Sequence, residues 1–212
     1  MVRKKTAAVF DVDGTLVQGG TERCFFLYLW RHRVLKSSKI LAFLAHLAAS
    51  PRERFRNKRY LKGLEVEEMV RLGHRCYREL IVPRLRPRAL DCLAKHRKQG
   101  RLIILITGSL DFLIQPLMKD LGADRLIATE PAQENGKFTG DLNNLHPRGE
   151  NKRLLLEKLA HQENLDLSAS YAYGDHLEDA AMLQAVGWPV AVNPNRGLKR
   201  LALKQGWLIE YF

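Results

Sequence analysis

Short apolar, β-prone runs alternate with helix-length segments from residue 101 to residue 212, and one more such run precedes Asp11. This alternation constrains the fold most strongly, because strands that are joined by helices pair in parallel within one sheet. The predicted strands are residues 7–12, 101–107, 125–129, 171–173, 189–192 and 207–211, and the predicted helices are residues 110–121, 151–161, 178–186 and 196–204. Asn135-Gly136 predicts a small hairpin within residues 130–142. We therefore expect an α/β fold built on a parallel sheet.

Residues 18–98 interrupt this pattern, since they show no β-alternation and several helix-length apolar patterns. Helices are predicted around Phe25 to Trp30, over residues 40–49, and from Val66 to Leu80. We expect an all-helical cap domain at residues 18–98, inserted after the first strand of an α/β core domain that comprises residues 1–17 and 99–212. A cap over the strand ends would exclude water and select substrates.

The formal charge of +12 is concentrated in one segment, because residues 18–100 hold 20 Lys and Arg against 7 Asp and Glu. The densest basic run covers residues 52–62. Such a run favours a phosphorylated substrate, a nucleic-acid backbone or an anionic membrane surface, and an ordinary solvated helix face is the alternative. Charge alone leaves these partners open.

Compartment and redox state follow from the apolar segments and the cysteines. No stretch approaches the roughly 20 apolar residues of a spanning helix, and the basic start makes a poor signal peptide, so we expect a cytoplasmic protein. Cys24, Cys76 and Cys92 fit no metal-binding pattern, which predicts structural thiols without a disulfide. The sequence gives no indication of the oligomeric state.

The segment Asp11-Val12-Asp13-Gly14-Thr15 places two carboxylates at the carboxyl end of the first predicted strand. Open α/β sheets bind ligands at that edge, and side chains two residues apart share a face of a strand. One carboxylate could attack as a nucleophile while the other moves a proton. Their repulsion favours a divalent cation or a raised pKa. A solvated acidic turn is the ordinary alternative.

Three further segments fall at predicted strand or helix ends. In Thr107-Gly108-Ser109, a hydroxyl and main-chain amides at a helix start could hold an anion. Lys152 near the next helix start could neutralise a phosphate. Asp175 follows a strand, Asp179 comes one helical turn later, and Asp175 could complete an oxygen-rich Mg²⁺ site with Asp11. Taken singly, each segment is also typical of an ordinary turn or a surface side chain.

In this order and spacing, these motifs resemble those of the haloacid dehalogenase superfamily, and the resemblance covers essentially the whole chain. The first motif is Asp11-Val12-Asp13-Gly14-Thr15, the second Thr107, the third Lys152, and the fourth Gly174-Asp175 with Asp179. The helical insert and residues 185–194 are similar to the phosphoserine-phosphatase-like branch, subfamily IB. The resemblance implies a Rossmann-like core with an inserted cap.

The resemblance also implies a Mg²⁺-dependent phosphatase that hydrolyses a phosphate monoester of a small phosphorylated metabolite. Asp11 would be the nucleophile that forms an aspartyl-phosphate, and Asp13 the general acid and base. Thr107, Gly108 and Lys152 would bind the phosphoryl group. The implied ligands of Mg²⁺ are Asp11, the Asp13 main-chain carbonyl and Asp175, with Asp179 in support. The acid at Asp13 is typical of phosphatases and phosphomutases, whereas dehalogenases lack it.

The substrate stays open at this stage. Phosphoserine phosphatases are expected to place a Glu where this chain has Gly20, and an Arg near Asn57. The apolar residues 40–49 before the basic run suggest a lipid-phosphate, phosphatidylglycerophosphate-type phosphatase that makes peripheral membrane contact through the cap. A phosphotransferase is a further alternative. A non-catalytic nucleic-acid-binding protein is disfavoured, because every expected catalytic position is filled.

Overall fold

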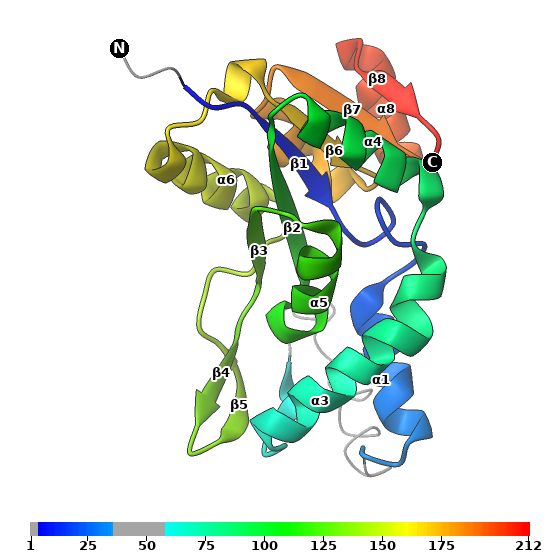
Figure 1. Cartoon of the computed structure of the whole chain (residues 1–212), viewed down its shortest axis with the longest axis vertical. Coiled ribbons are helices and arrows are strands. Elements are labelled where there is room, and N and C mark those ends of the chain that lie inside the picture. Colours follow the sequence, from blue (N-terminus) through cyan, green and yellow to red (C-terminus); the bar gives the residue numbers. More distant parts are fainter. Residues whose placement is uncertain (1–3, 36–57) are drawn as a thin grey trace.

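A six-stranded parallel sheet forms the centre of the computed structural model, which describes residues 4–35 and 58–212 (Figure 1). The strand order is β3-β2-β1-β6-β7-β8, and all five neighbouring pairs are parallel. The strands are β1 (Ala7–Asp11), β2 (Leu102–Leu110), β3 (Arg125–Thr129), β6 (Tyr171–Gly174), β7 (Trp188–Val192) and β8 (Leu208–Glu210). All six predicted strands are present, which confirms the α/β fold with a parallel sheet.

Helices cover both faces of the sheet because its central strands are apolar on both sides. Ala8 and Phe10 of β1 pack with α4 and α5 on one face, whereas Ala7 and Val9 pack with α6, α7 and α8 on the other. The helices are α4 (Pro87–Lys98), α5 (Asp111–Leu121), α6 (Glu150–Glu163), α7 (Ala180–Gln184) and α8 (Arg196–Gln205). With both faces covered, the carboxyl edge of the sheet is left for a binding site.

Two helices that follow β1 lie beyond this edge, in the lower half of Figure 1. They are α1 (Thr21–Arg31) and α3 (Val66–Cys76), which contact each other and α5. The predicted helix over residues 40–49 and residues 52–57 of the basic run lie outside the described residues. Helix α4 belongs to the predicted cap segment but packs on the sheet, where His96 stacks edge-on against Phe10. The division into core and cap domains therefore stays a prediction.

The Asn-Gly dipeptide forms the predicted hairpin, between β4 (Pro131–Glu134) and β5 (Lys137–Leu142). Asn135 and Gly136 have φ values of 50° and 76°, as a two-residue hairpin turn requires. Three main-chain hydrogen bonds join the hairpin to the segment before α3. Their donors and acceptors are Gly63 N to Phe138 O (2.8 Å), Val66 N to Gly136 O (2.9 Å) and Phe138 N to Leu64 O (3.0 Å). The hairpin thus links the sheet to the insert.

Strand β2 is longer than predicted. The sequence pattern ends it at Thr107 and begins a helix at Leu110, whereas the strand continues to Leu110 and α5 begins at Asp111. The strand reaches that far because β3 still pairs with it, Leu110 opposite Thr129, after a register shift beyond Ile106. Thr107, Gly108 and Ser109 accordingly lie on an irregular strand end, not at a helix start, which corrects that part of the prediction.

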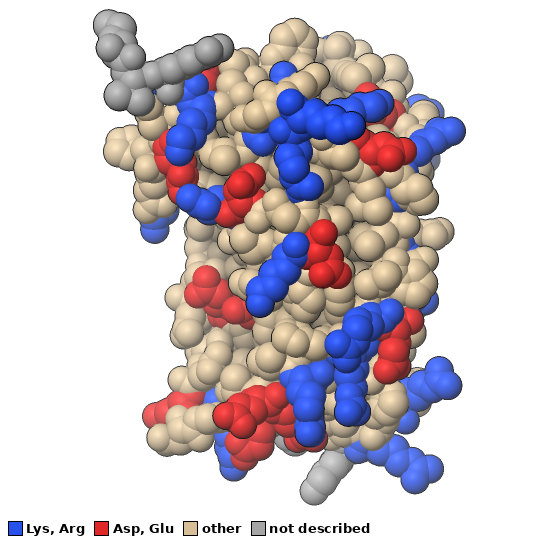
Figure 2. Space-filling model, in the orientation of Figure 1, with Lys and Arg blue, Asp and Glu red and all other residues tan. Residues whose placement is uncertain are grey.

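The basic side chains on the face shown in Figure 2 form groups over α4 and over α3, with acidic side chains among them. The exposed basic residues of these elements are Arg88, Lys95, Arg97 and Lys98 on α4, Arg71 and Arg75 on α3, and Arg78 just after α3. A continuous basic stripe, which a nucleic-acid backbone favours, is not formed on this face by the described residues. Among the same residues, no helix is both long enough and apolar enough to cross a bilayer.

A buried histidine makes the stability of the fold sensitive to acid. Arg101 Nη1 donates to His96 Nδ1 at 3.2 Å, so the ring proton lies on Nε2, which donates to the Tyr173 hydroxyl at 2.6 Å. Burial, and then the Arg101 charge, lower the pKa of His96 from 6.5 to about 4. The unfolded chain therefore binds a proton at His96 first as the pH falls.

We expect the free energy of unfolding to decrease as the pH falls from about 6.5 to about 4, by at most about 1.4 kcal/mol per pH unit for this one proton. Urea unfolding between pH 4.5 and pH 7.5 measures the slope. His96→Gln should flatten it, whereas His161→Gln, at an exposed position on α6, should not. Equal slopes for wild type and His96→Gln would contradict the prediction.

Candidate active site

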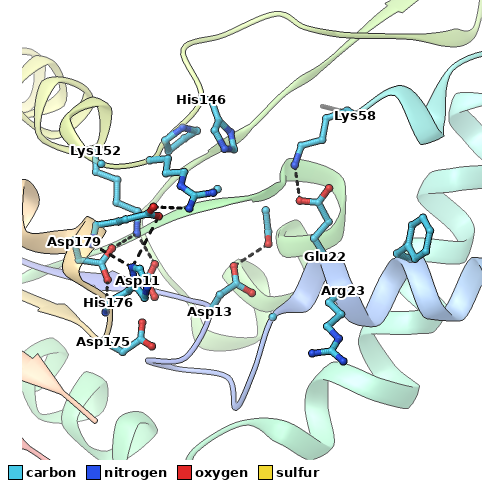
Figure 3. A pocket seen from close by; sticks show the side chains of 18 of the residues that line it. Asp11, Asp13, Glu22, Arg23, Lys58, His146, Lys152, Asp175, His176 and Asp179 are labelled. Carbon is cyan, nitrogen blue, oxygen red and sulfur yellow. Dashed lines mark hydrogen bonds and ion pairs between the residues drawn. The ribbon is translucent and has the colours of Figure 1, made fainter. Parts of the chain in front are cut away.

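Four predicted site residues meet at the carboxyl edge of the sheet, as Figure 3 shows. Asp11 ends β1, Asp175 directly follows β6, Asp179 lies just before α7, and Lys152 is in the first turn of α6. One carboxylate oxygen from each of the three acids lies within 4.8 Å of the others. The structure thus brings together residues that are up to 168 positions apart, because parallel strands end at the same edge.

Lys152 occupies the centre of this cluster. Its Nζ donates to Asp11 Oδ1 at 2.5 Å and to Asp179 Oδ1 at 2.6 Å, and the residue is 5% exposed. Burial alone would lower the pKa of Lys152, but the Asp11 and Asp179 carboxylates raise it above its ordinary value. Lys152 therefore stays charged at neutral pH and offsets the negative charge of the cluster.

Asp11 keeps one oxygen without a partner. Asp11 Oδ2 is buried and accepts no hydrogen bond from any described residue. Burial raises the pKa of Asp11, the Lys152 charge opposes that rise, and the Asp179 charge adds to it. A buried carboxylate oxygen without a partner is costly unless a cation or a ligand satisfies it. This oxygen is therefore available for an incoming electrophile or a metal ion.

The donor set of the three acids fits a hard divalent cation. Burial, and then the nearby Asp179 charge, raise the pKa of Asp175 to about 7, and a cation between the acids would relieve the repulsion from Asp179. Carboxylate oxygens are the ligands that Mg²⁺ prefers. The Asp13 carboxylate is not part of this group and accepts hydrogen bonds from Thr21, Thr107 and Ser109, so only its main-chain carbonyl stays a candidate ligand.

Gly14 allows Asp175 to approach the turn after β1. Its φ is +94°, a conformation that L side chains rarely adopt, and a Cβ at this position would lie 2.2 Å from Asp175 Oδ2. The glycine of the first motif is thus required by the carboxylate of the fourth motif.

Asp13 is held by hydroxyl groups from β2 and α1. Asp13 Oδ2 accepts from Thr107 Oγ1 and Ser109 Oγ, both at 2.8 Å. Asp13 Oδ1 accepts from the Thr21 amide at 2.5 Å and lies 2.7 Å from Thr21 Oγ1, whose single proton can serve Asp13 or Ser109. Sequence reasoning missed Thr21, and it named Ser109 only as part of an anion-binding segment, not as a partner of Asp13.

Thr107 and Gly108 differ in their access to the cavity. Thr107 is fully buried, and its hydroxyl is occupied by Asp13 and by the Ser109 amide, which donates to it at 3.0 Å. Gly108 lines the cavity, as do Ser109 and Lys152. The predicted phosphoryl-binding role of Thr107 therefore requires its hydroxyl to exchange its present acceptor.

His146 lines the same cavity as Asp11, and no sequence motif pointed to it. The Thr129 hydroxyl donates its one proton to Gly108 O at 2.7 Å, so His146 Nδ1, also 2.7 Å away, carries a proton and donates to Thr129 Oγ1. The imidazole is buried beside Gly108. This arrangement fixes both the ring and the strand end that carries Gly108.

The cavity over these residues has a volume of about 610 Å³ and extends from the acidic cluster to α1. At its α1 end it is lined by Gly20, Glu22, Arg23, Phe26, Lys58 and Tyr60. On the α6 side, Arg148 pairs with Glu178, and the His176 amide donates to Asp179 Oδ2 at 3.0 Å. A small organic molecule with a phosphate at the Asp11 end would fit this volume.

The chain is similar to known proteins. The family model for haloacid dehalogenase-like hydrolases matches residues 8–184. The probable phosphatase Rv3661 of Mycobacterium tuberculosis is 31% identical over 220 residues, which cover 99% of this chain and 76% of that protein. Phosphoserine phosphatase SerB1 of the same organism is also 31% identical, over 97% of this chain and 70% of its own length.

A solved structure matches the whole fold. A protein of unknown function from Bordetella pertussis Tohama I superposes with a TM-score of 0.86 at 25% identity, over 98% of this chain and 99% of that one. With the four motifs assembled at one edge of the sheet, the chain belongs to the haloacid dehalogenase-like hydrolases, in their phosphoserine-phosphatase-like branch.

Proposed function

We propose that this haloacid dehalogenase-like phosphatase hydrolyses a small phosphate monoester with Mg²⁺ and through an aspartyl-phosphate on Asp11. The observation that carries the proposal is the state of the Asp11 carboxylate. Its Oδ1 is fixed by Lys152, while its buried Oδ2 has no partner among the described residues. A carboxylate so held is aimed for attack on an electrophile in the cavity.

Asp11 attacks phosphorus and the bond to the leaving oxygen breaks, while Asp13 gives that oxygen a proton. Asp13 then takes a proton from the water that hydrolyses the aspartyl-phosphate. Lys152 and the Gly108 amide bind phosphoryl oxygens, and Thr107 joins them once its hydroxyl leaves Asp13. Asp11, Asp175, the Asp13 carbonyl and, in support, Asp179 would hold Mg²⁺, which supplies positive charge against the phosphoryl oxygens.

Metal dependence tests this proposal. Hydrolysis of p-nitrophenyl phosphate should require Mg²⁺, disappear with excess EDTA and return when Mg²⁺ is restored. Asp175→Asn should raise the Mg²⁺ concentration for half-maximal activity by about tenfold or more, because a ligand and a charge are lost. Asp91→Asn, at an exposed position on α4, is the matched control and should behave as wild type. Full activity in EDTA would overturn the metal assignment.

The lipid-phosphate alternative depends on the predicted amphipathic helix over residues 40–49, which lies outside the described residues. Nothing among the described residues favours a lipid over a soluble phosphate monoester. We therefore propose no second function.

A further inference from the structure

An internal ion pair occupies the end of the cavity opposite the acidic cluster. Glu22 extends from the first turn of α1, and Lys58 precedes the 3₁₀ turn Arg59–Leu61. Lys58 Nζ donates to Glu22 Oε2, and the Tyr60 hydroxyl donates to Glu22 Oε1 at 3.0 Å. All three residues line the cavity that contains Asp11. Figure 3 shows Glu22 and Lys58 facing each other, on the far side of Asp13 from Asp11.

This pair is built into the protein and is not a surface contact. The Lys58 side chain is 2% exposed, and that of Glu22 is 27% exposed. A buried ammonium needs a carboxylate partner, because an uncompensated buried charge is strongly destabilising. Both Glu22 oxygens already accept a hydrogen bond from the chain. Because Lys58 also offsets its charge, Glu22 would attract an ammonium group on a substrate only weakly.

Arg23 gives this end of the cavity a positive charge. The residue follows Glu22 on α1, lines the same cavity and is exposed. Within residues 4–35 and 58–212, no hydrogen bond or ion pair to the Arg23 side chain is found. Since Glu22 and Lys58 neutralise each other, Arg23 leaves one net positive charge among the described residues that line the α1 end of the cavity. Such a charge attracts an anionic group and repels an ammonium.

We infer that the Glu22–Lys58 pair, with Arg23 beside it, selects phosphorylated carboxylic acids that have no amino group near the phosphate. The inference rests on the proposed phosphatase function and names the substrate class of the same site. Lys58 is the residue that sets the specificity, because it neutralises Glu22, the one carboxylate among the described residues that line this end of the cavity. The phosphoryl end of the substrate is bound at Asp11 and its carboxylate lies toward Arg23.

Two probes that differ only in the group of interest test the inference. In 3-phosphoglycerate a hydroxyl replaces the ammonium of O-phosphoserine, while the phosphate and the carboxylate are the same. We expect wild type to show a kcat/KM for 3-phosphoglycerate about tenfold or more above that for phosphoserine. Equal values, or a preference for phosphoserine, would overturn the inference without any variant. Failure to hydrolyse p-nitrophenyl phosphate would instead overturn the proposed function.

Freeing Glu22 should largely remove the preference for 3-phosphoglycerate. Lys58→Met leaves the Glu22 carboxylate without its cation, so the ratio of kcat/KM values should move toward phosphoserine by about tenfold. The double variant Glu22→Gln/Lys58→Met removes the freed charge and should restore the wild-type ratio. Lys95→Met, at an exposed position on α4, is the matched control. If Lys58→Met still hydrolyses p-nitrophenyl phosphate but its ratio of kcat/KM values equals that of wild type, Lys58 does not set the specificity.

Tyr60→Phe keeps the experiment decisive if Lys58→Met fails to fold. It frees Glu22 Oε1 and leaves the ion pair in place, so a shift of a few fold toward phosphoserine is expected. An unchanged ratio in a folded Tyr60→Phe protein would contradict the inference. Arg23→Gln should raise the KM for 3-phosphoglycerate more than the KM for p-nitrophenyl phosphate, which has no carboxylate; an equal change for both would also contradict it.

Discussion

Replacing Asp11 with asparagine is expected to lower the rate of phosphate-monoester hydrolysis by about 1,000-fold or more. An amide does not attack phosphorus as a carboxylate does, so the variant lacks the nucleophile at the end of β1. The Lys152 charge remains paired with Asp179 at 2.6 Å, so the variant should fold. The loss should therefore be one of chemistry and not of structure.

Single-turnover hydrolysis of p-nitrophenyl phosphate at saturating Mg²⁺ measures this loss. Thermal unfolding of the same sample establishes that the variant is folded. Asp141→Asn is a suitable control, because Asp141 is exposed at the hairpin and lies outside the cavity. Wild type, trapped by rapid acid quench, should carry one phosphate on Asp11, and Asp11→Asn should carry none. A folded Asp11→Asn protein with a tenth of the wild-type rate would exclude Asp11 as the nucleophile.

Replacing Gly187 with alanine should have the largest effect on stability. A Cβ at Gly187 would lie 1.8 Å from Ser168 O and 2.7 Å from Ser168 C, which are main-chain atoms that no rotamer change can move. The Gly187 amide donates to Leu167 O at 2.9 Å, so the two segments are fixed at this separation. We expect the free energy of unfolding to fall by about 3 kcal/mol.

Urea unfolding of Gly187→Ala measures this change. Gly197→Ala is the matched control, since its nearest contact is the terminal methyl of the exposed Leu177 side chain at 3.1 Å. That methyl can rotate away, and alanine favours the α8 helix, so its effect should stay within about 1 kcal/mol. A similar small effect for Gly187→Ala would mean that the turn around Ser168 yields without cost.

Local sequence signals predicted most of the fold. Each predicted strand except the last is a short run of β-prone residues that ends at a glycine or polar residue, and Asn135-Gly136 is a turn determined by its own φ preferences. The predicted end of β2 was wrong because the length of this strand depends on its pairing with β3, whose residues lie 15 or more positions away in the sequence. Such pairing leaves no mark in the local composition.

The site residues also divide into those that local sequence signals predict and those that depend on long-range contacts. Asp11, Asp175 and Lys152 lie together because strand ends and helix starts of a parallel sheet must meet, which residue order alone predicts. Thr21 and Lys58 were missed because their contacts, to Asp13 and Glu22, depend on where the insert folds back. A buried lysine beside a glutamate looks like any member of a basic run until its burial is known.

The hydrogen bonds between the β4–β5 hairpin and residues 63–66 restrict how the cavity can open. If α1 and α3 swing away from the sheet, either those three bonds break or the hairpin travels with them. The hairpin continues into the loop of His146 and then into α6, which carries Lys152. The hairpin therefore connects the insert, at residues 63–66, to the helix that carries Lys152. An outward movement of the insert would therefore also act on the segment that leads to α6 and positions the Lys152 charge.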